Sequence, residues 1–217
     1  MLALKAGLLL LALAAWVSGG SVEAAGKGGE EGEMSGQREL TVFLGDSLTA
    51  GQDWNRALPG RETANLGISG DTCAGVWSRL DEAAALKPTR IFLQIGINDF
   101  LRGASSKEIL KGHRRIWDEL AALRPETRLY VVALLPYVEA ALPGLPPNLE
   151  IVRLNQALAA EADRRGLVFI DLFRALSDED HQLRLEYTSD GLHLTPQAYQ
   201  VWTEALRPHL SEDGAKE

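Results

Sequence analysis

The sequence predicts an α/β domain in which helices cover both faces of a parallel sheet. Two observations lead to this prediction. Apolar runs of strand length recur along the chain, and segments with helical periodicity lie between them. The runs are nearly continuously apolar, as expected for strands buried on both faces. Strands that alternate with helices form parallel sheets through right-handed crossovers, which predicts three layers, α/β/α.

Five apolar runs are predicted as strands. Each has a length that is common for strands in globular domains. The five are Leu40–Leu44, Ala64–Leu66, Ile91–Ile95, Leu129–Leu135 and Leu167–Ile170.

Between these runs, apolar residues spaced three and four apart predict helices. Ser105 and Glu108 have capping-box spacing at the start of the second helix. The last helix has Thr195 as its N-cap and Pro196 at its first helical position. The apolar faces contain Val76, Leu80 and Ala83, then Ile109, Ile116, Leu120 and Leu123, then Ile151, Leu154 and Leu158, and finally Tyr199 and Trp202.

Residues 1–24 have the composition of a secretory signal peptide. Lys5 provides a positive charge, Ala6–Val17 form an uncharged apolar run, and Val22–Ala24 fit a cleavage site. The run is shorter than the roughly 20 residues that a membrane-spanning helix needs. We therefore expect an exported protein, periplasmic or secreted, that is not stably inserted in a membrane. An uncleaved anchor and a buried core helix are the alternatives.

The rest of the chain divides into three parts. Residues 25–38 are rich in glycine and glutamate and are predicted to be a flexible linker. Residues 39–210 form the predicted single domain, and residues 211–217 a disordered tail. Cys73 is the only cysteine, so an intrachain disulfide is impossible and the core must provide the stability.

The formal net charge of −8 argues against nucleic acid or an anionic membrane as the main partner. Either partner would require a basic surface. Residues 178–181, Asp-Glu-Asp-His, are of metal-ligand types, but consecutive side chains rarely converge on one ion, so we interpret them as a solvated loop. We expect no metal and no cofactor.

Four polar clusters follow the predicted strands. In an open parallel sheet, ligands bind at the carboxyl ends of the strands, so these clusters are predicted to meet at one edge. Each alone has a structural explanation, such as a helix cap at Asp46 or a turn at Gly70. Their coincidence at one edge favours a catalytic site. The clusters are Gly45–Leu48, Gly67–Asp71, Gly96–Asp99 and Asp190–His193.

The clusters contain the side chains that a serine hydrolase needs. A serine hydroxyl such as that of Ser47 is a weak nucleophile without a base, and His193 is suited to that role near neutral pH. Asp190 can accept the other ring N–H of the histidine. The negative oxygen of a tetrahedral intermediate needs donors, which the backbone N–H groups of Ser47 and Gly70 and the amide of Asn98 can provide.

At these residues the sequence resembles the GDSL, or SGNH, hydrolases. The four blocks of that family match Ser47 within GDSL, Gly70 within GISGDT, Asn98 within GIND and His193 within DGLH. The resemblance extends over about residues 40–208. It implies a flavodoxin-like fold with a five-stranded parallel sheet, a triad of Ser47, His193 and Asp190, and an oxyanion hole made by Ser47, Gly70 and Asn98.

Within this family, the stretches GDSLTAGQDWN and NLGISGDT are similar to bacterial members that look like platelet-activating-factor acetylhydrolase and sialate O-acetylesterase. This similarity implies a carboxylic ester hydrolase for small acyl esters, mainly acetyl esters of a sugar or a lipid. The thioesterase/lysophospholipase branch, which shares the exported single-domain plan, is the alternative.

Three further features lie outside the four clusters. Trp54 and Asn55 follow the serine closely and are predicted to line the acyl or alcohol pocket, with packing of Trp54 against the sheet as the alternative. Residues 136–148 contain four prolines and form either a substrate-shaping loop or a plain connector. His113 is interpreted as a helix-surface residue.

Rival classes are disfavoured by particular residues. Thr49 stands where the G-x-S-x-G elbow of an ordinary α/β-hydrolase has its last glycine. Asp46 and Asp71 place negative charge where a flavin phosphate would bind in a flavodoxin-type protein. A catalytically silent carbohydrate-binding protein would not need the complete set of triad and oxyanion residues.

Overall fold

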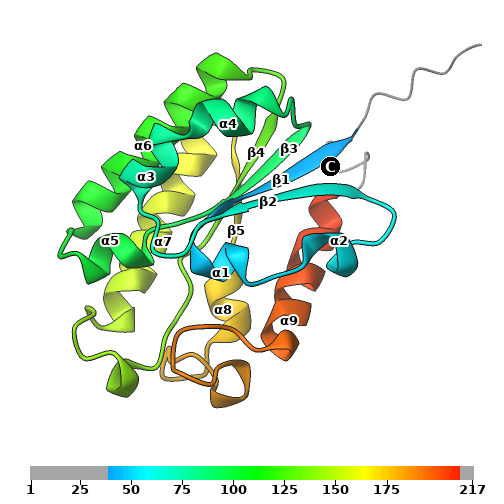
Figure 1. Cartoon of the computed structure of the whole chain (residues 1–217). Coiled ribbons are helices and arrows are strands. Elements are labelled where there is room, and N and C mark those ends of the chain that lie inside the picture. Colours follow the sequence, from blue (N-terminus) through cyan, green and yellow to red (C-terminus); the bar gives the residue numbers. More distant parts are fainter. Residues whose placement is uncertain (1–38, 211–217) are drawn as a thin grey trace, which may run out of the picture. The chain divides into compact units, whose positions relative to one another are not determined.

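The structure, a computed structural model, describes residues 39–210. In this range five parallel strands form one sheet in the order β2-β1-β3-β4-β5 (Figure 1), which is the flavodoxin-like order. The predicted fold class is confirmed. The predicted signal peptide, linker and tail lie outside the described residues. The strands are β1 (Leu40–Gly45), β2 (Glu62–Gly67), β3 (Arg90–Gln94), β4 (Arg128–Val132) and β5 (Val168–Ile170).

The position of a strand in the sheet decides how clearly the sequence predicts it. β1 and β3 lie inside the sheet, and every residue of both is buried. β2 forms one edge and is only partly covered, so the apolar run predicts no more than Ala64–Leu66 of it. Ala133–Leu135 are buried although β4 has ended, so their apolar character extends the prediction beyond the strand.

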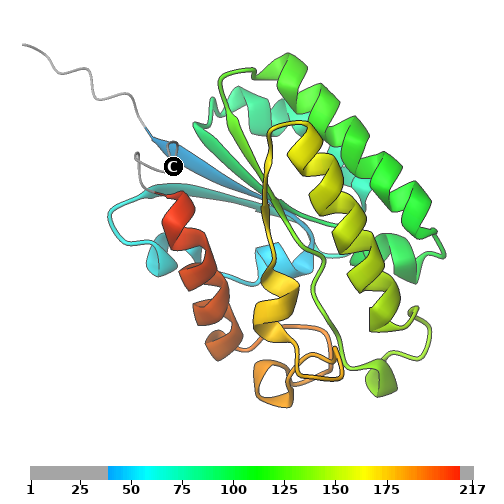
Figure 2. The same ribbon diagram turned by 180° about the vertical axis from the view of Figure 1, so that it is seen from behind.

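Helices cover both faces of the sheet. They are α1 (Ser47–Ala50), α2 (Trp54–Ala57), α3 (Cys73–Ser78), α4 (Leu80–Ala85), α5 (Ile97–Leu101), α6 (Ser106–Leu123), α7 (Asn148–Arg164), α8 (Leu172–Leu176) and α9 (Pro196–Leu206). α3, α4, α6 and α7 lie on one face, and α8 and α9 lie on the other (Figures 1 and 2). Within residues 39–210, short 3₁₀ turns complete the connections: η1 (Glu139–Ala141), η2 (Leu185–Tyr187) and η3 (Arg207–His209).

Local helix signals are confirmed where they depend on neighbouring residues alone. Ser105 and Glu108 form the predicted capping box of α6, and Thr195 caps α9 with proline in its first turn. The helix predicted through Val76 and Leu80 is instead two helices, α3 and α4. Arg79 separates them with φ −125° and ψ 20°, and its guanidinium pairs with Asp71, which precedes α3.

A row of aromatic rings fills the core beside the central strands. The ring centroids of Phe43 and Trp54 are 3.8 Å apart, and those of Phe43 and Phe92 are 5.4 Å apart. Trp202 of α9 meets Trp54 edge-on at 5.4 Å. Such ring pairs each add about 0.5–1.5 kcal/mol beyond area burial, so the row holds α2 and α9 against the sheet. Among residues 39–210, every helix is too short or too polar to cross a membrane.

Candidate active site

Ser47, His193 and Asp190 form a hydrogen-bonded row at the carboxyl edge of the sheet. β1 ends directly before Asp46, which caps α1 by accepting the N–H of Leu48 at 3.0 Å. Ser47 is therefore the first residue of a helix that follows a buried strand. Its Oγ lies 3.1 Å from His193 Nε2, and His193 Nδ1 lies 2.7 Å from Asp190 Oδ2.

The charge of Asp190 decides which ring nitrogen of His193 carries the proton. The Asp190 carboxylate accepts hydrogen bonds from His193 Nδ1–H and from the backbone N–H groups of Leu192 and His193, which hold the pKa of Asp190 well below its usual range. An ionised carboxylate only accepts hydrogen bonds, so Nδ1 carries the proton. Nε2 of the neutral ring is then the acceptor for the hydroxyl of Ser47, as a general base requires.

Hydrogen bonds also join the other two polar clusters to this edge. The N–H of Ile68, which follows β2, donates to the carbonyl of Gly45 at the end of β1, at 3.0 Å. Arg102, which follows α5, donates from Nη2 to the carbonyl of Gly70 at 2.8 Å. Asn98 is the second residue of α5. The four clusters predicted to share one sheet edge are therefore connected in the fold.

Gly70 and Asn98 have features of groups that bind a ligand. Gly70 has φ +79°, which favours glycine, and an added Cβ would meet only the end of Arg102, at 4.0 Å. The Nδ2 of Asn98 is buried and has no hydrogen-bond partner among residues 39–210. A buried donor without a partner costs about 1–3 kcal/mol. In native structures such a group calls for an explanation, and a catalytic role is one of the usual ones.

Three carboxyl groups lie behind the site. Asp46 is fully buried, and burial together with the charges of Asp71 and Asp99 raises its pKa to about 7. Asp71 forms an ion pair with Arg79 at 2.7 Å, with both side chains about 10% exposed. The loop after β1 is therefore backed by carboxyl groups, of which Asp71 is paired with Arg79 and Asp46 is partly protonated near neutral pH, so the argument from negative charge against a phosphate is weakened.

Trp54 packs against the sheet, in agreement with the alternative interpretation and not with a role in the substrate pocket, and Asn55 lies towards the opposite end of the strands from Ser47. Trp54 is 1% exposed, and its indole N–H donates to the carbonyl of Thr49 at 3.1 Å inside the core. Asn55 accepts a hydrogen bond at 2.9 Å from Thr63, at the amino end of β2, whereas Ser47 follows the carboxyl end of the parallel strand β1. The chain must return across the sheet before β2 begins, and α2 lies on that return path.

The segment 136–148 packs against the loop that carries His193. The N–H of Val138 donates to the carbonyl of Gly191 at 2.8 Å. A Cβ added at Gly191 would lie 2.5 Å from the Cβ of Ala141. The segment is therefore more than a connector, because it shapes the loop that holds the histidine.

His113 lies in the core, and its interpretation as a helix-surface residue is wrong. It is fully buried on α6, its Nε2 lies 3.1 Å from the carbonyl of Ile95, and burial lowers its pKa to about 4. The signal was present in the sequence: His113 is four residues after Ile109 and three before Ile116, within the apolar stripe of α6.

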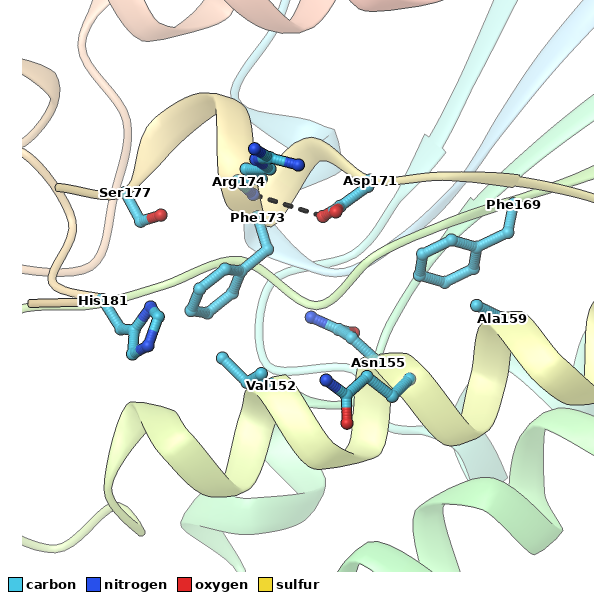
Figure 3. A pocket seen from close by; sticks show the side chains of 10 residues that line it. Val152, Asn155, Ala159, Phe169, Asp171, Phe173, Arg174, Ser177 and His181 are labelled. Atoms are coloured by element: carbon cyan, nitrogen blue, oxygen red, sulfur yellow. Dashed lines mark hydrogen bonds between the residues drawn. The ribbon is translucent and has the colours of Figure 1, made fainter. Parts of the chain in front are cut away.

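A cavity of about 350 Å³ lies away from this row, between α7, β5 and α8. Figure 3 shows the rings of Phe169 and Phe173 directed into the space above α7, with Asp171 accepting the backbone N–H of Arg174. The residues that line this cavity include none of the predicted site residues. His181, the last residue of the predicted solvated loop 178–181, also lines it.

A parallel α/β sheet that carries a hydrogen-bonded serine, histidine and aspartate at its carboxyl edge has the architecture of a hydrolase. The model of the GDSL-like lipase/acylhydrolase family matches residues 43–201. The chain belongs to this family. Family membership favours a hydrolase over the flavin-binding and carbohydrate-binding alternatives.

Named relatives and solved structures extend the similarity. N-acylneuraminate cytidylyltransferase of Streptococcus agalactiae is 29% identical over 173 residues, which are 76% of this chain but 39% of that protein, so the chain spans about two fifths of its length. Platelet-activating factor acetylhydrolase IB subunit alpha1 of Rattus norvegicus is 26% identical over 175 residues, 78% of this chain and 74% of that protein. A structure from Streptococcus pneumoniae, assigned provisionally as a platelet activating factor, has a TM-score of 0.73 and 27% identity, covering 82% of this chain and 87% of that one.

Proposed function

We propose that the protein is a serine esterase that cleaves small acyl esters, acetyl esters in particular, through an acyl-enzyme on Ser47. The observation that carries the proposal is the row of hydrogen bonds from Ser47 through His193 to Asp190, with spacings of 3.1 and 2.7 Å. The acetyl preference is supported by the similarity to a protein named as an acetylhydrolase. The side chains of His193 and Asp190 are 52% and 51% exposed, so an ester can reach them from solvent.

In the proposed reaction, Ser47 Oγ attacks the carbonyl carbon of the ester while His193 Nε2 takes the hydroxyl proton. Asp190 holds the Nδ1–H and stabilises the imidazolium. The N–H groups of Ser47 and Gly70 and the Nδ2 of Asn98 donate to the carbonyl oxygen as it becomes negative. The bond to the alcohol oxygen then breaks, and that oxygen receives the proton from His193.

The second half of the reaction regenerates the enzyme. Water attacks the acyl carbon, and His193 Nε2 takes a proton from the water. The bond between the acyl carbon and Ser47 Oγ breaks, His193 returns the proton to Oγ, and the free acid leaves. No other reactant is required, since each half uses the same base and the same oxyanion donors.

The proposal is tested by the variants Ser47→Ala and His193→Ala with p-nitrophenyl acetate as substrate. Each variant is expected to lose at least about 10⁴-fold in kcat, as other serine hydrolases do when the nucleophile or base is removed. The circular dichroism spectra of both variants should match that of the unaltered protein, which would show that the fold is intact. Ser78→Ala, at an exposed serine at the end of α3, is the matched control. Near-normal turnover by Ser47→Ala would overturn the proposal.

The acyl group is tested separately on the unaltered enzyme. A series of p-nitrophenyl esters from acetyl to dodecanoyl is measured beside an O-acetylated sugar, a lysophospholipid and a thioester. Activity confined to acetyl through butyryl esters and the acetylated sugar supports the acetyl preference. A preference for octanoyl or longer chains, with cleavage of the lysophospholipid or thioester, would establish the thioesterase/lysophospholipase alternative instead.

A further inference from the structure

Two side chains at α5 hold the loop that carries Gly70. Arg102 donates from Nη2 to the carbonyl of Gly70 at 2.8 Å. Asp99 accepts the backbone N–H of Cys73 with its two carboxylate oxygens, at 3.2 and 3.0 Å. The first contact fixes the loop at Gly70, and the second fixes it where α3 begins.

The same short helix contains Asn98. The N–H of Arg102 lies 3.1 Å from the carbonyl of Asn98 and 3.1 Å from that of Asp99, so the residue that holds the loop also closes the helix. The side-chain amide of Asn98 belongs to α5, and the N–H of Gly70 belongs to the loop that α5 holds. One structural element therefore sets the relative position of both donors.

The loop depends on such outside contacts because Gly70 restricts the backbone very little. It has φ +79°, no side chain, and open space where a Cβ would stand. Within the loop, the N–H of Asp71 donates to the carbonyl of Ile68 at 3.0 Å. The bond from Arg102 adds a restraint on the peptide unit that directly follows Gly70.

We propose that Asp99 and Arg102 are positioning residues for ester hydrolysis, which hold the N–H of Gly70 in register with the amide of Asn98. The inference rests on the proposed function, because that function assigns the N–H of Gly70 and the amide of Asn98 as donors to the oxyanion. Displacement of a catalytic group by about 1 Å can cost about 10²-fold in rate. Since both side chains contact backbone of the enzyme, their loss should lower kcat and leave KM almost unchanged.

The first test replaces the guanidinium while keeping the apolar stem of the side chain. Arg102→Met is expected to lower kcat for p-nitrophenyl acetate about 10- to 100-fold, somewhat less than the loss of an oxyanion donor itself. Arg102→Lys can still donate to the carbonyl of Gly70 and should recover most of the activity. Arg153→Met, at an exposed arginine of α7 that pairs with Glu150, is the matched control and should retain full activity.

The second test concerns the other contact. Asp99→Ala should lower kcat, whereas Asp99→Asn retains an oxygen acceptor for the N–H of Cys73 and should lose less. The double variant with Arg102→Met should lose little more than the worse single variant, since both act on one loop. If Asp99→Ala does not fold, the Arg102 series decides alone, because Arg102 is exposed.

A readout specific to the oxyanion is the binding of a trifluoromethyl ketone, which forms a tetrahedral adduct with serine. In Arg102→Met its affinity should fall in proportion to kcat. Ser47→Ala, measured with p-nitrophenyl acetate, separates the two proposals. If this variant still hydrolyses the ester, the proposed function fails. If it is inactive while Arg102→Met keeps kcat within about twofold of the unaltered enzyme, or loses only in KM, the positioning role alone is overturned.

Discussion

At the scale of single residues, the carboxyl group of Asp46 has an unusual environment. It is fully buried directly before Ser47, and Oδ1 accepts the N–H of Leu48. Oδ2 has no hydrogen-bond partner within the described part of the chain. Burial is the main reason that its pKa rises to about 7, from an ordinary value of 3.8. The carboxyl group is therefore uncharged in mildly acidic solution, and a rise in pH forces a charge into the core.

This environment predicts a pH-dependent stability. Between pH 3.8 and about 7 the folded state keeps a proton on Asp46 that the unfolded chain has lost, so stability decreases as pH rises through this range. Asp46→Asn keeps an oxygen acceptor for the N–H of Leu48 and has no charge to bury. It should raise Tm by several degrees at pH 8, with little change at pH 4.

The measurement is thermal unfolding followed by circular dichroism at both pH values. Asp53→Asn is the matched control, because Asp53 caps α2 in the same way but is exposed. The same change in Tm at pH 4 and pH 8 for Asp46→Asn would show that the proton on Asp46 is not the cause.

At the scale of structural elements, the loop with His193 depends on its contact with the segment 136–148. Gly191 has φ +91°, and its N–H donates to Thr188 Oγ1 at 2.9 Å. The position has no room for a side chain, because Val138 and Ala141 approach it from the segment. Two loops that are distant in the sequence therefore set the position of His193, the proposed base, together.

Gly191→Ala should disturb both stability and activity. Backbone strain at positive φ and the collision with Ala141 should destabilise the fold by about 1–3 kcal/mol. Since His193 is two residues away, kcat should fall at least about tenfold through displacement of the base. Gly144→Ala in the same segment is the control, because an added Cβ there meets no atom within 4 Å. Equal effects of the two substitutions on kcat and Tm would contradict this account.

At the scale of the whole molecule, residues 1–24 predict where the protein is located. We propose that the protein is exported and cleaved after Ala24, since Lys5 and the apolar run Ala6–Val17 fit a signal peptide. Cleavage would remove Lys5 and Glu23 together, so the net charge of −8 would not change. A protein with this negative charge is repelled by an anionic surface, so small soluble esters are the better substrates for the proposed exported esterase.

Export is tested by expression of the full chain in a bacterium followed by N-terminal sequencing. The protein in the periplasm or medium should begin at Ala25. Leu10→Arg places a charge in the apolar run and should retain the protein in the cell, whereas Leu10→Ile should not. Exported protein that still begins at residue 1 would support an uncleaved anchor instead.

The sequence predicts elements well where the signal is local. The capping box of Ser105 and Glu108 and the cap at Thr195 are confirmed because each depends on residues within one helical turn. α1, α2, α5 and α8 are not predicted, since four or five residues are too few to show a period. The break at Arg79 is missed because residues 76–83 contain neither glycine nor proline, so the apolar period continues through it.

The sequence alone predicts the α/β class and the sheet edge that carries Ser47, Gly70, Asn98 and His193. It could do so because parallel strands send all their carboxyl ends to one edge, whatever the details of packing. Which other residues lie at or contact that edge depends on the tertiary structure. It buried Trp54 in the core, returned Asn55 to the opposite end of the strands, and set Asp99 and Arg102 against the Gly70 loop. Periodicity reports which face of an element is covered, whereas a hydrogen bond between distant residues exists only after the elements have packed.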